Sequence, residues 1–169
     1  LLQKSLQREL FISFDPNYRQ LLFQNDKPSF INQSKHFLNN CHFFKVSDEE
    51  ALMLTGRQTV EEAAADFLQN AKAVFAITIG KEGTLLGIDG KTEIVPSIEI
   101  KPVDTTGAGD AFVGAVLYQL NKKSLAEIKA MQLPAWREII LNANKAGART
   151  CEYMGAMEAF KHLNNRIFL

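Results

Sequence analysis

Residues 104–112 read Asp-Thr-Thr-Gly-Ala-Gly-Asp-Ala-Phe, a stretch that joins two glycines and a carboxylate to an apolar segment. Glycines let the backbone turn tightly and bring its N–H groups close to a ligand. The apolar segment predicts a helix, whose first turn presents unpaired N–H donors and the positive end of the helix dipole. The stretch therefore predicts an anion-binding helix start, with Asp110 in its first turn.

Two interpretations of this stretch follow from the residues. A carboxylate beside such donors can take a proton from an attacking hydroxyl while the N–H groups stabilise growing negative charge. The alternative is a helix start that only turns the chain, with Asp110 favoured there by the dipole. No Lys-Ser/Thr pair follows the glycines, and Phe112 stands where a third glycine would belong. The stretch is thus neither a Walker A loop nor a dinucleotide-binding fingerprint.

The sequence DTTGAGDAF resembles the carboxy-terminal signature of the ribokinase-like (PfkB) carbohydrate kinases. The resemblance extends from about Phe11 to Met157 and keeps the motifs of the family in order. It implies an α/β fold: a three-layer sandwich with a mostly parallel sheet and helices on both faces. Residues 1–169 would form the carboxy-terminal, ATP-binding and catalytic part of one domain. The amino-terminal half, with the lid and the sugar-binding residues, is expected to be absent, and the start at Leu1 instead of methionine agrees with that.

The pattern of apolar and turn residues predicts alternating strands and helices, which is typical of an α/β sheet. Capping boxes predict helix starts at Thr59–Glu62, Ser47–Glu50 and Ser124–Glu127. A helix from Thr106 to Leu120 is expected to be buried on most sides, and another from Pro134 carries an apolar stripe. The stripe consists of Trp136, Ile139, Ile140, Ala143 and Gly147. The expected strands are 11–14, 41–46, 74–79, 84–88 and 93–95, with a hairpin at Asp89-Gly90.

The resemblance implies an enzyme that phosphorylates a primary hydroxyl of a sugar with ATP and Mg²⁺. Asp110 would be the base, and the backbone N–H groups of Gly107, Ala108, Gly109 and Asp110 would form the anion hole. The motifs are most similar to those of fructokinases, with keto-deoxygluconate kinase as the alternative. The sugar stays open, because the family selects it largely with the missing half. A nucleotide-binding remnant that needs a partner chain is a second alternative, and we expect residues 1–169 alone not to phosphorylate a sugar.

Two motifs follow the first two predicted strands, and ligands of open α/β sheets bind beyond the carboxyl ends of strands. Asp15-Pro16-Asn17-Tyr18-Arg19 has good turn chemistry by itself. The resemblance implies that Arg19 faces the sugar or the transferred phosphoryl group, and a planar guanidinium is suited to bind either one. The second motif is Lys45-Val46-Ser47-Asp48-Glu49-Glu50. The resemblance implies that Lys45 binds the nucleotide and that Glu50 lies near magnesium, which it contacts through water. The family usually has Asn where this chain has Ser47, and a purely structural capping box is the alternative.

Two further motifs are assigned to the nucleotide by the resemblance. The run from Thr78 to Gly83, with Gly80 between them, would lie along the ribose and phosphates, although the glycines could simply open a hairpin. The run 143–148 would wall the adenine pocket, with Asn144 beside the base and Gly147 one turn further. Its small residues also suit close helix packing. In related kinases carbonyl groups hold potassium near the positions of Asp104, Thr106 and Gly155, which implies an optional K⁺ site here.

Composition limits the partners of the chain. Lys plus Arg and Asp plus Glu both number 19, so no overall field recruits nucleic acid or an acidic membrane. The apolar stretches are too short to cross a bilayer. The two isolated cysteines are expected to be reduced and buried, which indicates a cytoplasmic protein. The histidines lack zinc-ligand spacing. Sugar and ATP are the expected small-molecule partners, and loss of the first half would leave a sheet edge open to self-association or a homodimer.

Overall fold

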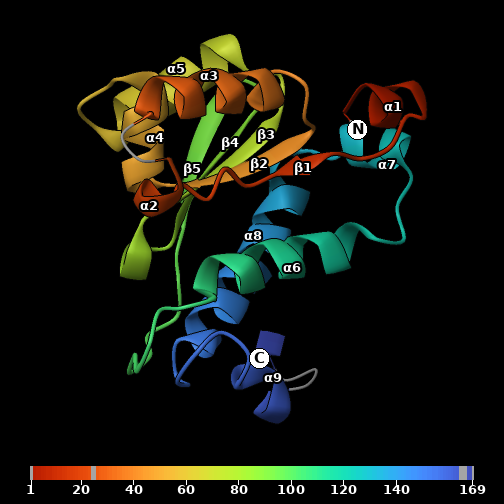
Figure 1. Ribbon diagram of the computed structural model, residues 1–169. Coiled ribbons are helices and arrows are strands. Elements are labelled where there is room, and N and C mark those ends of the chain that lie inside the picture. The colour runs from red at the N-terminus through yellow and green to blue at the C-terminus, as the bar shows by residue number, and fades with distance from the viewer. Residues whose placement is uncertain (1, 24–25, 164–166, 169) are drawn as a thin grey trace. The chain divides into compact units, whose positions relative to one another are not determined.

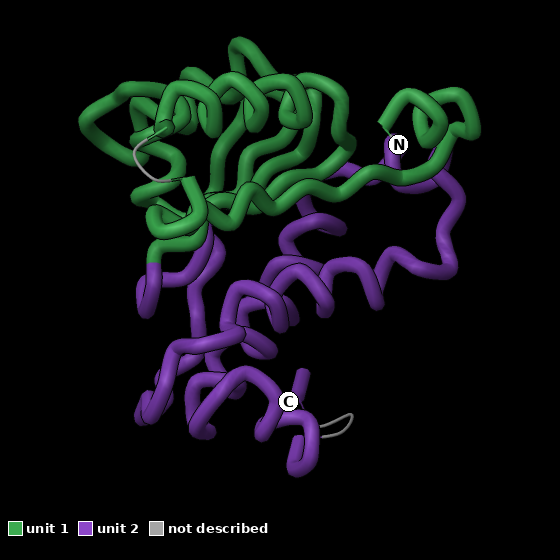
Figure 2. The backbone as a smooth tube through the Cα atoms, viewed as in Figure 1, with its two compact units in different colours: residues 1–79, 85–93 green, residues 80–84, 94–169 purple. Residues whose placement is uncertain are grey.

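The computed structural model describes residues 2–23, 26–163 and 167–168. The chain divides into two compact units, coloured separately in Figure 2. Unit 1 consists of residues 1–79 and 85–93, and unit 2 consists of residues 80–84 and 94–169. The predicted motifs fall in both units.

A five-stranded sheet with the strand order β1-β2-β3-β4-β5 forms the framework of unit 1 (Figure 1), except that Thr84 of β4 and residues 94–95 of β5 belong to unit 2. The strands β1 (Ser13–Phe14), β2 (Phe43–Ser47) and β3 (Val74–Thr78) run parallel, with Phe44 paired to Phe14 on one side and to Phe75 on the other. Parallel strands place their carboxyl ends at one edge of the sheet. That edge carries Asp15, Ser47 and the residues after Thr78, as the sequence predicts.

The last two strands, β4 (Thr84–Ile88) and β5 (Lys91–Val95), form the predicted hairpin. Its two turn residues, Asp89 and Gly90, have φ values of 50° and 74°, as a tight two-residue turn between twisted strands requires. The link from β3 to β4 contains only the short 3-10 helix η1 (Gly80–Glu82), and a parallel crossover needs a dozen residues or more. The sheet is therefore mixed, parallel from β1 to β3 and antiparallel beyond.

Three helices cover one face of this sheet: α3 (Lys27–Leu38), α4 (Asp48–Thr55) and α5 (Val60–Asn70) (Figure 1). They bury one apolar cluster with β2 and β3, in which the rings of Phe44, Phe67 and Phe75 lie 5.1–5.5 Å apart. Gly87 on β4 makes room for this cluster, since a Cβ atom there would lie 2.0 Å from the Phe75 ring. The Phe75 ring on β3 thus packs against Gly87 on β4 and joins the parallel part of the sheet to the rest of it.

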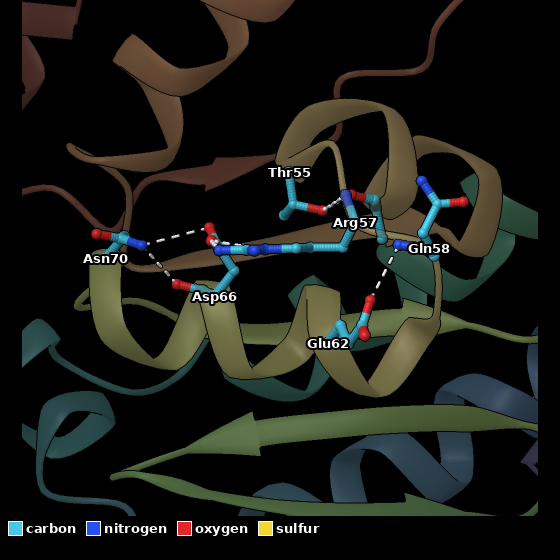
Figure 3. Close-up of polar contacts among 7 residues, drawn as sticks. Thr55, Arg57, Gln58, Glu62, Asp66 and Asn70 are labelled. Carbon is cyan, nitrogen blue, oxygen red and sulfur yellow. Dashed lines mark hydrogen bonds and ion pairs between the residues drawn. The ribbon is translucent and has the colours of Figure 1, made fainter.

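The connection from α4 to α5 is held by polar side chains (Figure 3). Arg57 donates to the Asp66 carboxylate over 2.9 Å, and Asn70 donates to the same carboxylate from one turn further along α5. The capping box predicted at the start of α5 forms only in half. Thr59 accepts from the Glu62 N–H, but the Glu62 carboxylate accepts from the N–H of Gln58 instead of that of Thr59. The box prediction is wrong there, whereas the boxes at Ser47 and Ser124 are confirmed.

Unit 2 is built on two helices, α6 (Ala108–Leu120) and α8 (Leu133–Thr150), linked through α7 (Leu125–Lys129). Gln119 of α6 donates to the Ile139 carbonyl of α8 over 3.1 Å and accepts from Asn142 over 2.9 Å. All five residues of the predicted stripe on α8 are buried. The prediction that α6 is buried on most sides is wrong in part, because Gly114, Leu117 and Tyr118 form an exposed face. The short helices α1 (Leu2–Gln7), α2 (Gln20–Phe23) and α9 (Ala159–His162) complete the described elements.

Both cysteines are free and buried, as expected. Cys41 lies in unit 1, where burial raises the pKa of its thiol to about 12. Cys151 ends α8 in unit 2, and burial raises the pKa of its thiol as well. Each unit therefore contains one thiol that stays protonated at neutral pH.

The ring cluster generates a stability prediction. Replacing Phe75, which is 1% exposed, by Ala removes the contacts of two neighbouring rings and leaves a cavity. We expect the free energy of unfolding to fall by about 3–5 kcal/mol, measured by urea denaturation. The control is Leu21→Ala, because Leu21 is 91% exposed in the same unit and should change stability by less than about 0.5 kcal/mol. Equal effects of the two substitutions would show that the cluster does not stabilise unit 1.

Candidate active site

In unit 1, a lysine and an aspartate meet at the carboxyl ends of β1 and β2. The Lys45 ammonium and the Asp15 carboxylate lie 3.4 Å apart, and their side chains are only 11% and 18% exposed. The second Asp15 oxygen, Oδ1, is buried and has no hydrogen-bond partner among the described residues. Burial raises the pKa of Asp15, while Lys45 opposes the shift and Glu50 adds to it. This pair therefore keeps hydrogen-bonding capacity that the described residues do not use.

Glu50 connects the two motifs of unit 1. Its Oε1 accepts the N–H of Tyr18 over 2.6 Å, and its Oε2 accepts the N–H of Ser47 over 2.9 Å. The Ser47 hydroxyl accepts from the Glu50 N–H in return, which closes the capping box at the start of α4. Glu50 is 8% exposed. The Glu50 carboxylate thus connects the loop after β1 to the start of the helix after β2. Each of its oxygens keeps one lone pair that can accept a further hydrogen bond.

The other predicted residues of unit 1 flank this pair of motifs. The Thr78 hydroxyl donates to the Val46 carbonyl over 3.3 Å, so the end of β3 is fixed to β2. Arg19 is exposed and directly precedes α2, with its carbonyl oxygen accepting from Leu22 and Phe23. The structure therefore brings Lys45, Glu50 and Asp15 together, whereas Arg19 lies exposed at the surface.

In unit 2, the start of α6 has the form that the sequence predicts. Gly107 is the N-cap residue with φ 85°, and no side chain caps the helix. The N–H groups of Gly107, Gly109 and Asp110 donate to no described residue, whereas that of Ala108 bonds to the Thr105 carbonyl over 3.2 Å. A Cβ atom at Gly107 would lie 2.7 Å from that of Ala156, so only glycine suits the turn. Three unpaired donors and the exposed Asp110 carboxylate thus lie within one helical turn.

Asp104 anchors the loop that leads into this helix. Its Oδ1 accepts from both the N–H and the hydroxyl of Thr106, and its Oδ2 accepts from the N–H of Gly155 over 2.8 Å. The carbonyl oxygen of Cys151 accepts from the N–H groups of Val103 and Asp104. The structure therefore brings Asp104, Thr106 and Gly155 together. These hydrogen bonds, led by that of the Thr106 hydroxyl, lower the pKa of Asp104.

Asn144 and Gly147 lie on the buried face of α8, one turn apart. Asn144 donates to the carbonyls of Val95 and Pro96 over 2.8 and 3.1 Å, and its Oδ1 accepts from the Thr84 hydroxyl over 2.6 Å. A Cβ atom at Gly147 would lie 3.1 Å from the carbonyl oxygen of Ala108 at the start of α6. α8 therefore supports two of the predicted loops at once.

The two predicted glycines of the loop after β3 have positive φ angles, 53° at Gly80 and 110° at Gly83. A Cβ atom at Gly83 would lie 2.2 Å from the Val95 carbonyl oxygen and 2.7 Å from the Ser97 nitrogen. Gly83 therefore permits a backbone contact that any side chain would block.

Sequence reasoning missed Thr84 and the pairing of Asp15 with Lys45. Thr84 is 0% exposed and reads in the sequence as an ordinary strand residue. A buried hydroxyl needs a partner, but its partner lies 60 positions away, so no local pattern points to it.

A cavity of about 390 Å³ beside the carboxyl ends of α3, α4 and α5 contains none of the predicted site residues. Within the described residues no cluster of three metal-ligating side chains occurs, and none of the helices is long and apolar enough to span a membrane.

Comparison with known proteins defines the class. The model of the pfkB family of carbohydrate kinases matches residues 1–162, so the chain belongs to this family. It is 33% identical over 150 residues to the probable fructokinase-4 of Arabidopsis thaliana, which is 88% of this chain and 44% of that protein. The chain thus spans about half the length of such relatives and matches their carboxy-terminal portion.

Two solved structures support the same fold. One is a double mutant of fructokinase from Vibrio cholerae O395 in its fructose, ADP and potassium ion bound form. It has a TM-score of 0.79 and 29% identity over 94% of this chain and 49% of its own. The other is aminoimidazole riboside kinase from Salmonella enterica, complexed with aminoimidazole riboside and an ATP analogue. It has a TM-score of 0.82 and 27% identity over 94% and 51% of the two chains. The predicted ribokinase-like α/β fold is confirmed.

The two shifted carboxyl groups generate a prediction on pH. The pKa of Asp15 should lie above the ordinary value of 3.8 and that of Asp104 below it. Asp104 therefore adds stability above pH 3.8 that is lost as the pH falls through its folded pKa, whereas Asp15 costs stability as the pH rises through its own. A ¹³C NMR titration of the side-chain carboxyl groups measures both pKa values. The variants Asp15→Asn and Asp104→Asn identify which signal belongs to each residue. Midpoints at 3.8 for both would contradict the burial of Asp15 and the hydrogen bonds accepted by Asp104.

Proposed function

We propose that the chain forms the ATP-binding and phosphoryl-transfer portion of a sugar kinase, with a primary hydroxyl of fructose as the acceptor. The supporting observation is the start of α6, where three N–H groups that donate to no described residue share one turn with the Asp110 carboxylate. Fructokinases among the relatives favour fructose over the alternative, keto-deoxygluconate. Family membership and use of ATP point to the cytoplasm as its location.

Asp110 acts as the general base. Its carboxylate takes the proton from the sugar hydroxyl while the hydroxyl oxygen forms a bond to the γ-phosphorus. The bond from that phosphorus to the oxygen bridging it to the β-phosphate breaks, and ADP leaves with the electron pair. The N–H groups of Gly107, Gly109 and Asp110 stabilise the charge on the transferring group, and Ala108 contributes its N–H if the weak bond to Thr105 opens.

The remaining predicted residues position the nucleotide. Among the described residues the Lys45 ammonium contacts only Asp15, so two of its N–H donors suit a phosphate oxygen. Gly80 and Gly83 allow close backbone approach along the ribose and phosphates. Arg19 faces the sugar or the phosphoryl group. Asn144 and Gly147 belong to the wall of the adenine pocket.

The donor set of unit 1 suits magnesium held through water. Mg²⁺ keeps several waters and binds through carboxylates and phosphates, and both the free Oδ1 of Asp15 and the lone pairs of Glu50 can accept from such waters. When bound, the ion offsets negative charge on the phosphates. For potassium, carbonyl oxygens of Asp104, Thr106 and Gly155 would hold the ion, and the hydrogen bonds that the Asp104 carboxylate accepts from Thr106 and Gly155 keep these three residues together.

A second candidate function rests on the length of the chain. Because it spans about half of its relatives, residues 1–169 could bind ATP and depend on another polypeptide for the sugar. Measuring ATP affinity and fructose phosphorylation on these residues and on the full natural polypeptide separates the two. ATP binding without turnover by the chain, and turnover by the natural polypeptide, supports the proposed kinase. Absence of ATP binding by both would refute it.

Replacing Asp110 by Asn tests the catalytic base. The amide keeps the shape of the side chain but cannot take a proton, so turnover in the full natural polypeptide should fall by about 10²–10⁴-fold. ATP affinity should stay within about twofold, because the anion hole is made by backbone groups. The control is Asp89→Asn in the hairpin turn, a carboxylate outside the site. Near-normal activity of Asp110→Asn would exclude the assigned role.

Potassium dependence is tested by activity in different salts. We expect faster fructose phosphorylation in potassium chloride than in tetramethylammonium chloride at equal ionic strength, since carbonyl oxygens can coordinate K⁺ but not the bulky cation. Asp104→Asn should weaken the response, because the neutral amide no longer accepts equally from Thr106 and Gly155. Identical rates in both salts would argue against a potassium site.

A further inference from the structure

We propose that Thr84 and Asn144 form a positioning clamp for the glycine turn of the nucleotide site, and that the Asn144 amide does not select the base. The inference rests on the proposed nucleotide binding and assigns a different role to Asn144 from the one that resemblance implies. All the residues involved lie in unit 2.

The hydrogen bonds of Asn144 leave its amide no free donor. Carbonyl oxygens only accept, so the group that faces Val95 and Pro96 must be the NH₂, and both of its N–H bonds are used. The Oδ1 atom then accepts from the Thr84 hydroxyl over 2.6 Å. Asn144 is 6% exposed and Thr84 is 0% exposed. A side chain so engaged cannot donate to a base nitrogen without breaking a buried hydrogen bond.

The clamp joins the two segments that flank the glycine turn. Thr84 directly follows Gly83, and Val95 and Pro96 are the residues against which the Gly83 backbone packs. Asn144 bonds to both segments, so it fixes the position of Gly83 relative to α8. One turn further, Gly147 of the same helix sets the distance of α8 from Ala108. The clamp therefore sets the spacing between the glycine turn and the anion hole, which a nucleotide would have to span.

Three possible roles of these hydrogen bonds predict different nucleotide affinities. If the clamp positions the turn, cutting it weakens the binding of ATP and GTP by the same factor. If Asn144 reads the base, its loss changes the ratio of the two affinities. A purely structural hydrogen bond would lower thermal stability and leave both affinities of the folded protein unchanged.

The experiment measures dissociation constants of ATP and GTP by calorimetry on residues 1–169, well below the melting temperature of each variant. Thr84→Val removes the hydroxyl at nearly constant volume, and Thr84→Ser restores it. We expect Thr84→Val to weaken the binding of both nucleotides about tenfold, with an unchanged ratio, and Thr84→Ser to stay within about twofold of the wild type. Asn144→Ala should act in the same way on both nucleotides.

The matched control is Thr150→Val. Thr150 is also 0% exposed, but its hydroxyl donates only to Ala146 within α8, so its removal should leave nucleotide affinity within about twofold. The amide resonances of Gly80 and Gly83 should shift in Thr84→Val and not in Thr150→Val. Unchanged affinity in Thr84→Val, or an altered ATP-to-GTP ratio in Asn144→Ala, would overturn the clamp alone. Absence of nucleotide binding by the wild type would overturn the clamp together with the proposed function.

Discussion

The close backbone approach of α8 to the loops around it is the constraint on which unit 2 depends. Asn144, Gly147 and Cys151 are spaced by three and four positions, so they lie along one stripe of the helix. They contact, in turn, the Val95–Pro96 segment, the carbonyl of Ala108 and the N–H groups of residues 103–104. A larger residue at position 147 would push the helix away from α6. One face of α8 therefore holds three segments of unit 2 in position.

In unit 1 the main constraint is different, because charged side chains lie at the ends of buried strands. Burial of an unpaired charge is costly, and Glu50 avoids this by accepting two backbone N–H groups with its two oxygens. Asp15 and Lys45 neutralise each other in part, at 3.4 Å, without using all their hydrogen bonds. The unit thereby combines rigid backbone positions with polar groups that are still able to bind a ligand.

Local patterns predicted much of this arrangement, and non-local contacts account for the rest. The capping boxes at Ser47 and Ser124, the hairpin at Asp89-Gly90 and the apolar stripe of α8 depend on neighbours in sequence, and all were predicted. The Thr84–Asn144 pair and the Asp15–Lys45 pair join residues 60 and 30 positions apart, beyond the reach of periodicity. The failed box at Thr59 has a local cause instead, because the N–H of Gln58, four positions before Glu62, takes the Glu62 carboxylate. The exposed face of α6 could not be predicted from composition, since an apolar helix looks buried whichever neighbours it has.

The two cysteines give each unit its own chemical reporter. Only a thiolate attacks an alkylating or disulfide reagent, and a thiol whose pKa is raised by burial is unreactive until the surrounding structure opens. Labelling at Cys41 therefore records opening of the first unit, and labelling at Cys151 records opening of the second. Comparing the two labelling rates would separate local opening around the end of α8 from cooperative unfolding of the sheet, without substituting any residue.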